Sequence, residues 1–206
     1  MSCHPRRAER ERRPAALILA GGRARRLGGI EKPLLSLGGR TVLERIIAAL
    51  GESVSPIAIS VNGDPAQFAR FGLPVLADGR FLGEGPLAGV LAGLDWAAAV
   101  GASALLTVPG DTPFLPAGLA SALAPPPAAA ASGGRRHHLV ALWPLAARDA
   151  LGRRFAVPGP RAVGEFADAL GIRTVPFASD PWDPFFNINS PSDLALAEAI
   201  AERVPV

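Results

Sequence analysis

Short apolar runs, each closed by glycine or a small polar residue, recur along this chain and constrain its fold more than any other feature. Four of them lie at residues 15–20 (AALILA), 56–61 (PIAISV), 73–77 (LPVLA) and 104–108 (ALLTV). A continuous apolar run of this length is typical of a strand buried on both faces, as in a parallel sheet. Stretches with helical periodicity separate several of the runs. This alternation predicts an α/β protein with three layers: a doubly wound, mainly parallel sheet covered by helices on both faces.

Capping sequences mark where several of these helices begin. Thr41 and Glu44 have the spacing of a capping box, and Ser190 and Asp193 repeat that spacing near the C-terminus. Pro86 suits the first turn of another helix. The helix after Thr41 has one apolar face, formed by Val42, Leu43, Ile46, Ile47 and Leu50. The sequence therefore predicts helices that begin after Thr41, at Pro86 and after Ser190.

The second half of the chain is less regular. We expect residues 125–136 (PPPAAAASGGRR) to form a flexible excursion inside the domain, since the chain that follows is too short to fold alone. Strands are expected at residues 138–142 and 172–177, with a helix from about residue 160 to 170 between them. Gly171 suits the C-terminal cap of that helix. The chain is thus predicted to form one domain, at residues 14–206, after a short N-terminal tail.

The charge of the chain is concentrated in that tail. The sequence pI is about 10.3, which suggests nucleic-acid binding. Residues 1–13, however, hold five arginines and two glutamates, and so account for a net charge equal to the +3 of the whole chain. The domain that follows is near neutral, so we expect a solvated basic tail and no nucleic-acid partner.

Cysteine content and run length indicate the compartment. Cys3 is the chain's single cysteine, so no intrachain disulfide can form, as is typical of a reducing compartment. The apolar run at residues 15–20 is far too short to span a membrane. We therefore expect a cytoplasmic protein without a membrane partner.

Polar or glycine residues follow four of the predicted strands. Gly21 and Gly22 follow the first, and Asn62, Asp78 and Asp111 follow the next three. Each alone is an ordinary turn residue. Because the carboxyl ends of parallel strands meet at one edge of the sheet, their joint occurrence predicts a ligand site there.

The loop at residues 20–33 (AGGRARRLGGIEKP) holds Lys32, the only lysine of a chain that otherwise uses arginine. The loop matches neither the Walker A pattern nor the dinucleotide-binding pattern, so it predicts neither class. Pro33 restricts the backbone of Lys32, which we expect to be extended. A compact ammonium on a stiff backbone suits a phosphate whose charge moves during a reaction. The alternative is a lysine with no special role.

Asp111 follows a buried run and precedes Thr112 and Pro113. A carboxylate there suits Mg²⁺, which takes one or two protein oxygens and completes its shell with phosphate and water. The alternative is that Asp111 caps a helix beginning near Thr112. Asn189 offers another oxygen just before the last helix.

Four motifs in order resemble those of one enzyme family. They are L-A-G-G-x-x-x-R-x-G-G-x-x-K (residues 19–32), GPLAG (85–89), PGDTPFLP (109–116) and NINSPSDL (187–194). The chain resembles the molybdenum cofactor guanylyltransferases, within the nucleotidyltransferase superfamily, along most of its length. The resemblance implies a Rossmann-like nucleotidyltransferase fold and transfer of GMP from GTP to the phosphate of Mo-molybdopterin. The products would be molybdopterin guanine dinucleotide and pyrophosphate.

The resemblance also implies roles for residues at the motif positions. The residues expected to bind the nucleotide are Leu19, Ala20, Gly21, Gly22, Lys32, Asn62, Asp78 and Asp111. Lys32, Asp111 and Arg26 would be the catalytic residues, and Asp111 with Asn189 would hold Mg²⁺. Partners implied beside GTP and Mo-molybdopterin are proteins of molybdenum insertion and molybdoenzyme maturation. No general base is expected, because the attacking phosphate monoester has a second pKa of about 6 and is already anionic at neutral pH.

One minor departure from the family pattern is Glu31, where family members often have Asp; the larger departures lie on the acceptor side. The family commonly has His-Pro after the proline-rich tract, where this chain has His137 and His138. Residues 152–164 are the segment expected to cover the pterin. Three alternatives stay open: a cytidylyltransferase for the same pterin, a nucleotidyltransferase for another phosphate acceptor, and a non-catalytic nucleotide-binding adaptor.

Overall fold

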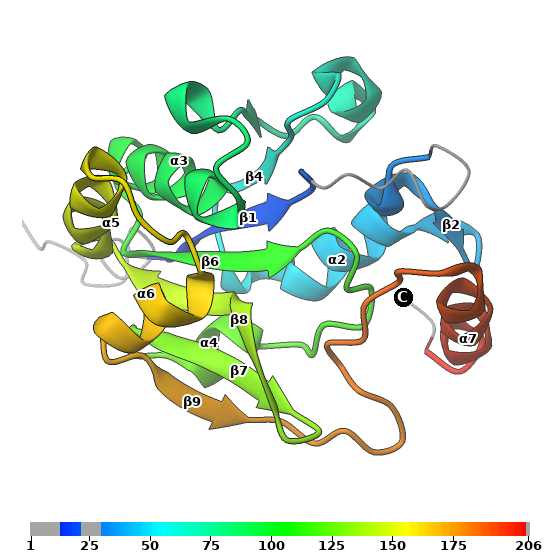
Figure 1. Ribbon diagram of the computed structural model, residues 1–206. Coiled ribbons are helices and arrows are strands. Elements are labelled where there is room, and N and C mark those ends of the chain that lie inside the picture. The colour runs from blue at the N-terminus through cyan, green and yellow to red at the C-terminus, as the bar shows by residue number, and fades with distance from the viewer. Residues whose placement is uncertain (1–12, 22–29, 205–206) are drawn as a thin grey trace, which may run out of the picture.

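A seven-stranded sheet forms the centre of the computed structural model, which describes residues 13–21 and 30–204 (Figure 1). In spatial order its strands are β5 (Val75–Leu76), β4 (Ile57–Ser60), β1 (Ala15–Leu19), β6 (Ala104–Pro109), β8 (Arg135–Pro144), β7 (Ala128–Ser132) and β9 (Arg173–Pro176). The pairs β5–β4, β4–β1, β1–β6 and β7–β9 are parallel, whereas β8 runs antiparallel to both of its neighbours. The predicted mainly parallel sheet is confirmed.

Helices cover both faces of this sheet (Figure 1). One face packs against α2 (Val42–Leu50), α4 (Leu119–Leu123) and α7 (Pro191–Ala201), and the other against α3 (Pro86–Ala99), α5 (Ala147–Ala156) and α6 (Val163–Ala169). Strand β1 shows why two cores form: Ala16 and Ile18 point into the first, and Ala15 and Leu17 into the second. The three-layer α/β architecture is therefore confirmed.

Shorter elements complete the described chain. They are the 3₁₀ helices η1 (Lys32–Leu34), η2 (Gly51–Ser53), η3 (Pro65–Phe71) and η4 (Gly79–Phe81), and the hairpin strands β2 (Ser36–Leu37) and β3 (Arg40–Thr41). The capping box at α2 is present, since the Thr41 N–H donates to Glu44 at 2.6 Å and the Glu44 N–H donates to Thr41 Oγ1 at 3.2 Å. The helices begin where their capping signals predicted.

The expectation of a flexible excursion at residues 125–136 is wrong. Residues Ala128–Ser132 form strand β7, in which Ala128, Ala129 and Ala130 are fully buried. Gly133 and Gly134 both have positive φ, at 53° and 76°, and connect β7 directly to β8. A Gly-Gly pair is a strong signal for a tight hairpin. Small alanines lower the apparent hydropathy of a strand, but they fit beneath the neighbouring helices.

Two further boundaries differ from expectation. Residues 152–156, expected to begin a loop over the pterin, belong instead to α5. The strand expected at residues 138–142 lies within the longer β8, which extends beyond it at both ends. The predicted tail at residues 1–13 lies almost entirely outside the described residues, so the domain division stays a prediction. Among the described helices, none has both the length and the apolar character that a membrane crossing requires.

Candidate active site

A cleft of about 1700 Å³ lies at the edge of the sheet where β1, β4, β5 and β6 end. Eight residues predicted from the sequence line it: Leu19, Ala20, Gly21, Lys32, Asn62, Asp78, Asp111 and Asn189. The fold therefore brings together residues that lie far apart in the chain, such as Lys32 and Asn189, which are 157 positions apart. Gly22 and Arg26, also predicted for the site, lie outside the described residues.

Asp78 forms one end of the cleft together with two residues of the neighbouring strand segment. Asn62 Nδ2 donates to Asp78 Oδ2 at 2.6 Å, and Ser60 Oγ donates to Asp78 Oδ1 at 3.2 Å. Helix α3 packs so closely here that a Cβ on Gly89 would stand 3.2 Å from Asp78 Oδ1. Asp78 is only 6% exposed. The Asp78 carboxylate is thus a hydrogen-bond acceptor that its neighbours hold in one orientation.

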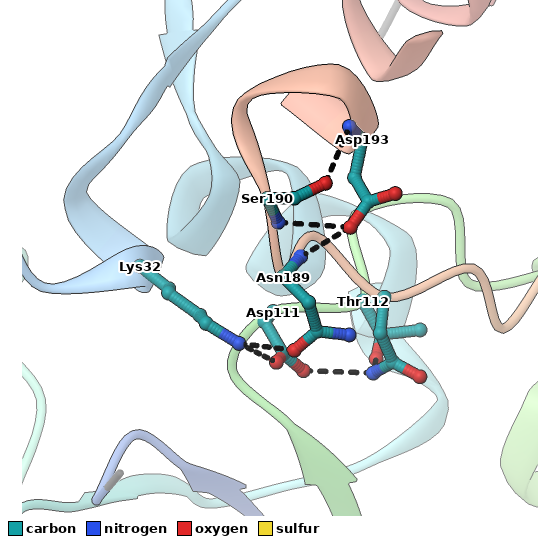
Figure 2. Close-up of polar contacts among 7 residues, drawn as sticks. Lys32, Asp111, Thr112, Asn189, Ser190 and Asp193 are labelled. Atoms are coloured by element: carbon teal, nitrogen blue, oxygen red, sulfur yellow. Dashed lines mark hydrogen bonds and ion pairs between the residues drawn. The ribbon is translucent and has the colours of Figure 1, made fainter. Parts of the chain in front are cut away.

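Lys32, Asp111 and Asn189 form a second polar cluster in the same cleft (Figure 2). Lys32 Nζ donates to Asp111 Oδ2 at 2.9 Å and to Asn189 Oδ1 at 2.5 Å. The second oxygen of Asp111 accepts from Asn187 Nδ2 at 2.8 Å, and that amide also contacts Thr112 Oγ1 at 3.0 Å. Two oxygens from different segments therefore converge on one cation, and the Lys32–Asp111 pair is only about one-fifth exposed, at 18% and 20%.

The turn at η1 places Lys32. The Leu34 N–H donates to the Glu31 carbonyl at 2.8 Å, and the Leu35 N–H donates to the Lys32 carbonyl at 3.2 Å. The expectation of an extended Lys32 is wrong, because Lys32 begins this 3₁₀ turn, and the extended residue is Glu31 with ψ of 125°. The stiffness predicted from Pro33 is provided by the turn, where a proline in the first positions loses no hydrogen bond.

The capping box of α7 fixes Asn189 (Figure 2). Asp193 Oδ2 accepts from the backbone N–H of Asn189 at 2.9 Å and from that of Ser190 at 2.8 Å. These hydrogen bonds, that from Asn189 first, lower the pKa of the Asp193 carboxyl from its ordinary value of 3.8. The start of α7 therefore orients the backbone from which Asn189 reaches Lys32.

Gly110 allows the β6 end and the loop after β1 to approach each other. Its N–H donates to the Leu19 carbonyl at 2.9 Å. A Cβ at this position would lie 2.9 Å from Pro33 Cγ and 3.1 Å from the Leu19 oxygen.

The alternative that Asp111 caps a helix near Thr112 is wrong, since the next described helix, α4, begins at Leu119. Asp111 is instead held in the cleft by Lys32 and Asn187.

The rest of the cleft is bounded by β8 and the start of α6. Arg135, Arg136, His137 and His138 line it from β8. On the α6 side, a Cβ on Gly164 would lie 3.2 Å from His138 Nε2, so the glycine leaves room for that ring. This half of the cleft is the more basic one. Of the segment expected to cover the pterin, only residues 163–164 line the cleft.

Three residues of the site escaped the sequence analysis: Ser60, Thr112 and Asn187. Ser60 was recognisable only as a polar residue near the end of an apolar run, and Asn187 as the first asparagine of an Asn-x-Asn sequence. Their partners lie 18 and 76 positions away, respectively, so no local pattern could reveal them.

Comparison with known proteins gives consistent matches over most of the chain. A family model described as MobA-like NTP transferase domain matches residues 16–171. A relative from Acidiphilium cryptum named molybdenum cofactor guanylyltransferase is 59% identical over 184 residues, covering 89% of this chain and 93% of the relative. One of the same name from Mesorhizobium japonicum is 46% identical over 201 residues, covering 92% and 97%. The crystal structure of molybdopterin-guanine dinucleotide biosynthesis protein A from Archaeoglobus fulgidus has a TM-score of 0.69 at 24% identity, covering 92% of this chain and 100% of that one, and shows the same fold.

Proposed function

The chain belongs to the MobA-like NTP transferase family, and we propose that it transfers GMP from GTP to the phosphate of Mo-molybdopterin. The products would be molybdopterin guanine dinucleotide and pyrophosphate; two relatives named molybdenum cofactor guanylyltransferase support transfer of a guanylyl group to this cofactor. One structural observation carries the assignment of roles within the site. A single cleft has a fixed carboxylate at Asp78 and a separate cation–oxygen cluster at Lys32, Asp111 and Asn189.

Asp78 is the residue we assign to the guanine base. A guanine edge presents N–H groups as donors, and a carboxylate can only accept. Asn62 and Ser60 already hold the Asp78 carboxylate, so its orientation does not have to be established when the base binds. Leu19, Ala20 and Gly21 line the same cleft at the end of β1, the strand between β4 and β6, and are assigned to the nucleoside.

Lys32 is assigned to the phosphates of GTP. Its ammonium group is held by Asp111 and Asn189, so it is already positioned in the cleft. Phosphate oxygens then replace the Asn189 and Asp111 oxygens as its partners. Lys32 thereby screens the repulsion between two anions and stabilises charge on the departing pyrophosphate.

Magnesium is the cofactor we assign to the oxygens that Lys32 vacates. Asp111 Oδ2 and Asn189 Oδ1 lie 2.9 Å and 2.5 Å from a cationic nitrogen, which supports their ability to converge on a cation. Among residues 13–21 and 30–204, no group of three or more His, Cys, Asp or Glu side chains could hold a metal. That suits Mg²⁺, which in such sites takes few protein ligands and several phosphate and water oxygens. When bound, the ion neutralises phosphate charge.

The acceptor is assigned to the basic half of the cleft beside β8. Its phosphate oxygen attacks the α-phosphorus of GTP, the new P–O bond forms, and the bond to the β-phosphate breaks. The acceptor is already deprotonated at neutral pH, so no proton has to be removed by the protein. Catalysis rests on orientation and charge rather than on a general base. The product then passes to proteins of molybdoenzyme maturation in the cytoplasm.

Release of pyrophosphate tests this proposal. Purified protein with Mg²⁺ should release pyrophosphate from GTP only when Mo-molybdopterin is present, and Asp111→Ala should abolish the release. Release from CTP but not from GTP would contradict the base assignment. Release from neither nucleotide would support the adaptor alternative.

A further inference from the structure

A buried polar network joins the basic half of the cleft to the segment that carries the site asparagines. Ser132 Oγ donates to Asp183 Oδ1 at 2.6 Å and lies 2.7 Å from His137 Nε2. Ser132 belongs to β7 and His137 to β8, so both lie on the β7–β8 hairpin. Ser132 and Asp183 have no role in the reaction proposed above, and His137 enters it only as one of the residues that line the acceptor half of the cleft.

The number of hydrogens that each group carries determines which group donates in each hydrogen bond. A carboxylate only accepts, so the single hydroxyl hydrogen of Ser132 goes to Asp183. The Ser132 oxygen then accepts from His137, which must carry its hydrogen on Nε2. Ser132 and His137 are 4% and 8% exposed, so water does not readily replace these bonds. Burial, the largest cause, lowers the pKa of His137, and Arg135 and His138 lower it further, while Asp183 opposes them. The lowered pKa favours the neutral form of the imidazole.

Residues 183–189, here called the asparagine segment, are anchored at both ends. At the first end, Asp183 Oδ1 also accepts from the Phe185 N–H at 2.8 Å, and the His137 ring packs against the Phe185 ring at 4.9 Å between centroids. Between Asn187 and Asn189, the Ile188 N–H donates to the Asp111 carbonyl at 3.1 Å. At the far end lies the capping box of α7. Of these anchors, only the Ser132–Asp183 bond ties the segment by a charged hydrogen bond to the β7–β8 hairpin.

We propose that Ser132 and His137 are positioning residues which, through Asp183, set the asparagine segment so that Asn187 and Asn189 meet Asp111 and Lys32. The expected effect on kcat rests on the proposed function, whereas the expected effect on the position of the asparagine segment does not. The three residues act at a distance, because none of them contacts Lys32 or Asp111 among the hydrogen bonds of the described chain. Residues that hold ligand-bearing groups in this way typically affect activity by about 10-fold to 100-fold when removed.

Amide hydrogen exchange in the ligand-free protein tests the structural part. Ser132→Ala leaves the acceptor of the Ile188 N–H intact, so a change there must be transmitted along the segment. We expect the Ile188 amide to exchange about 10-fold faster or more, while the Ile18 amide in β1 is unaffected. Ser121→Ala, at an exposed serine in α4, is the matched control and should change neither amide.

Kinetics test the catalytic part. In Ser132→Ala we expect kcat to fall about 10-fold with the KM for GTP changed by less than about twofold. Asp183→Ala should behave in the same way. Asp183→Asn keeps an oxygen that can accept from Ser132 and Phe185, and should restore most of kcat.

Two results would overturn the inference: unchanged Ile188 exchange in Ser132→Ala, or faster exchange without loss of kcat. The test is separable from that of the proposed function. If the wild-type protein made no dinucleotide, the exchange comparison would still decide whether the network positions the segment.

Discussion

Replacement of Gly110 by alanine tests how strictly the cleft depends on the approach of β6 to the loop after β1. The φ of Gly110 is not among the positive values, so an added Cβ causes no backbone strain. It would, however, lie 2.9 Å from Pro33 Cγ, 3.1 Å from the Leu19 oxygen and 3.2 Å from Ala20 Cα. Ordinary carbon contacts are about 3.5–4.0 Å, so Pro33 must shift by roughly half an ångström or more.

The expected cost of this overpacking is about 1–3 kcal/mol. With a urea m value of about 2 kcal/mol/M, a cost of about 2 kcal/mol lowers the unfolding midpoint by about 1 M. Because Pro33 adjoins Lys32 in η1, kcat should fall by about 10-fold or more as the ammonium is displaced. Urea titration and steady-state kinetics of Gly110→Ala measure both effects.

The matched control is Gly152→Ala. Gly152 lies inside α5, and its added Cβ would meet no atom within 4 Å. Alanine there should stabilise the protein by about 0.5–1 kcal/mol and leave kcat unchanged. If Gly110→Ala unfolded at the wild-type urea concentration and kept full kcat, the tight approach described here would not matter to the site.

Three further predictions concern charge. Lys32→Arg should lower kcat by about 10-fold or more although the charge is kept, because a planar guanidinium cannot replace a compact ammonium between Asp111 and Asn189. A pyrophosphate-release assay measures kcat. Full activity of Lys32→Arg would refute the requirement for lysine. Burial lowers the pKa of His137 in the folded protein below its ordinary value of 6.5. As pH falls below 6.5, His137 therefore takes up a proton in the unfolded chain before it does so in the folded one. The free energy of unfolding should decline over this range, until pH falls below the pKa of the folded state. In urea titrations from pH 7.5 downward, the free energy of unfolding of His137→Gln should decline less than that of the wild-type protein. The same pH dependence in both proteins would contradict this role of His137. Asp193 has a pKa lowered from 3.8, so its stabilising effect is present above pH 3.8 and is lost as pH falls through the pKa of the folded state. At neutral pH its carboxylate accepts from the Asn189 and Ser190 N–H groups, so Asp193→Ala should speed amide exchange at both residues. Unchanged exchange would contradict the capping role of Asp193.

The strands with strong local signals were predictable from the sequence. Residues 15–20 include Leu17, Ile18 and Leu19, residues 104–108 include Leu105, Leu106 and Val108, and both runs form buried central strands. The alanine strand β7 was not predictable in the same way, because proline-rich flanks and small side chains resemble a linker. Burial of Ala128–Ser132 depends on the helices that cover it, which is information from tertiary packing.

The candidate site was predictable as a set of positions but not as a geometry. Strand ends indicated Asn62, Asp78 and Asp111, and the fold places all three in one cleft. Which of them pair was not encoded locally: Asn62 bonds to Asp78, whereas Asp111 bonds to Lys32. The positioning network at Ser132 was invisible as well, since Asp183 is 51 positions away.

Detection of the dinucleotide product is the most direct test of the central claim. Wild-type protein is incubated with Mg²⁺, Mo-molybdopterin and either GTP, CTP or ATP, and the products are identified by mass spectrometry. The account predicts molybdopterin guanine dinucleotide from GTP, little or no dinucleotide from CTP or ATP, and none from GTP with Asp111→Ala. A cytosine dinucleotide as the main product, or full activity of Asp111→Ala, would contradict it.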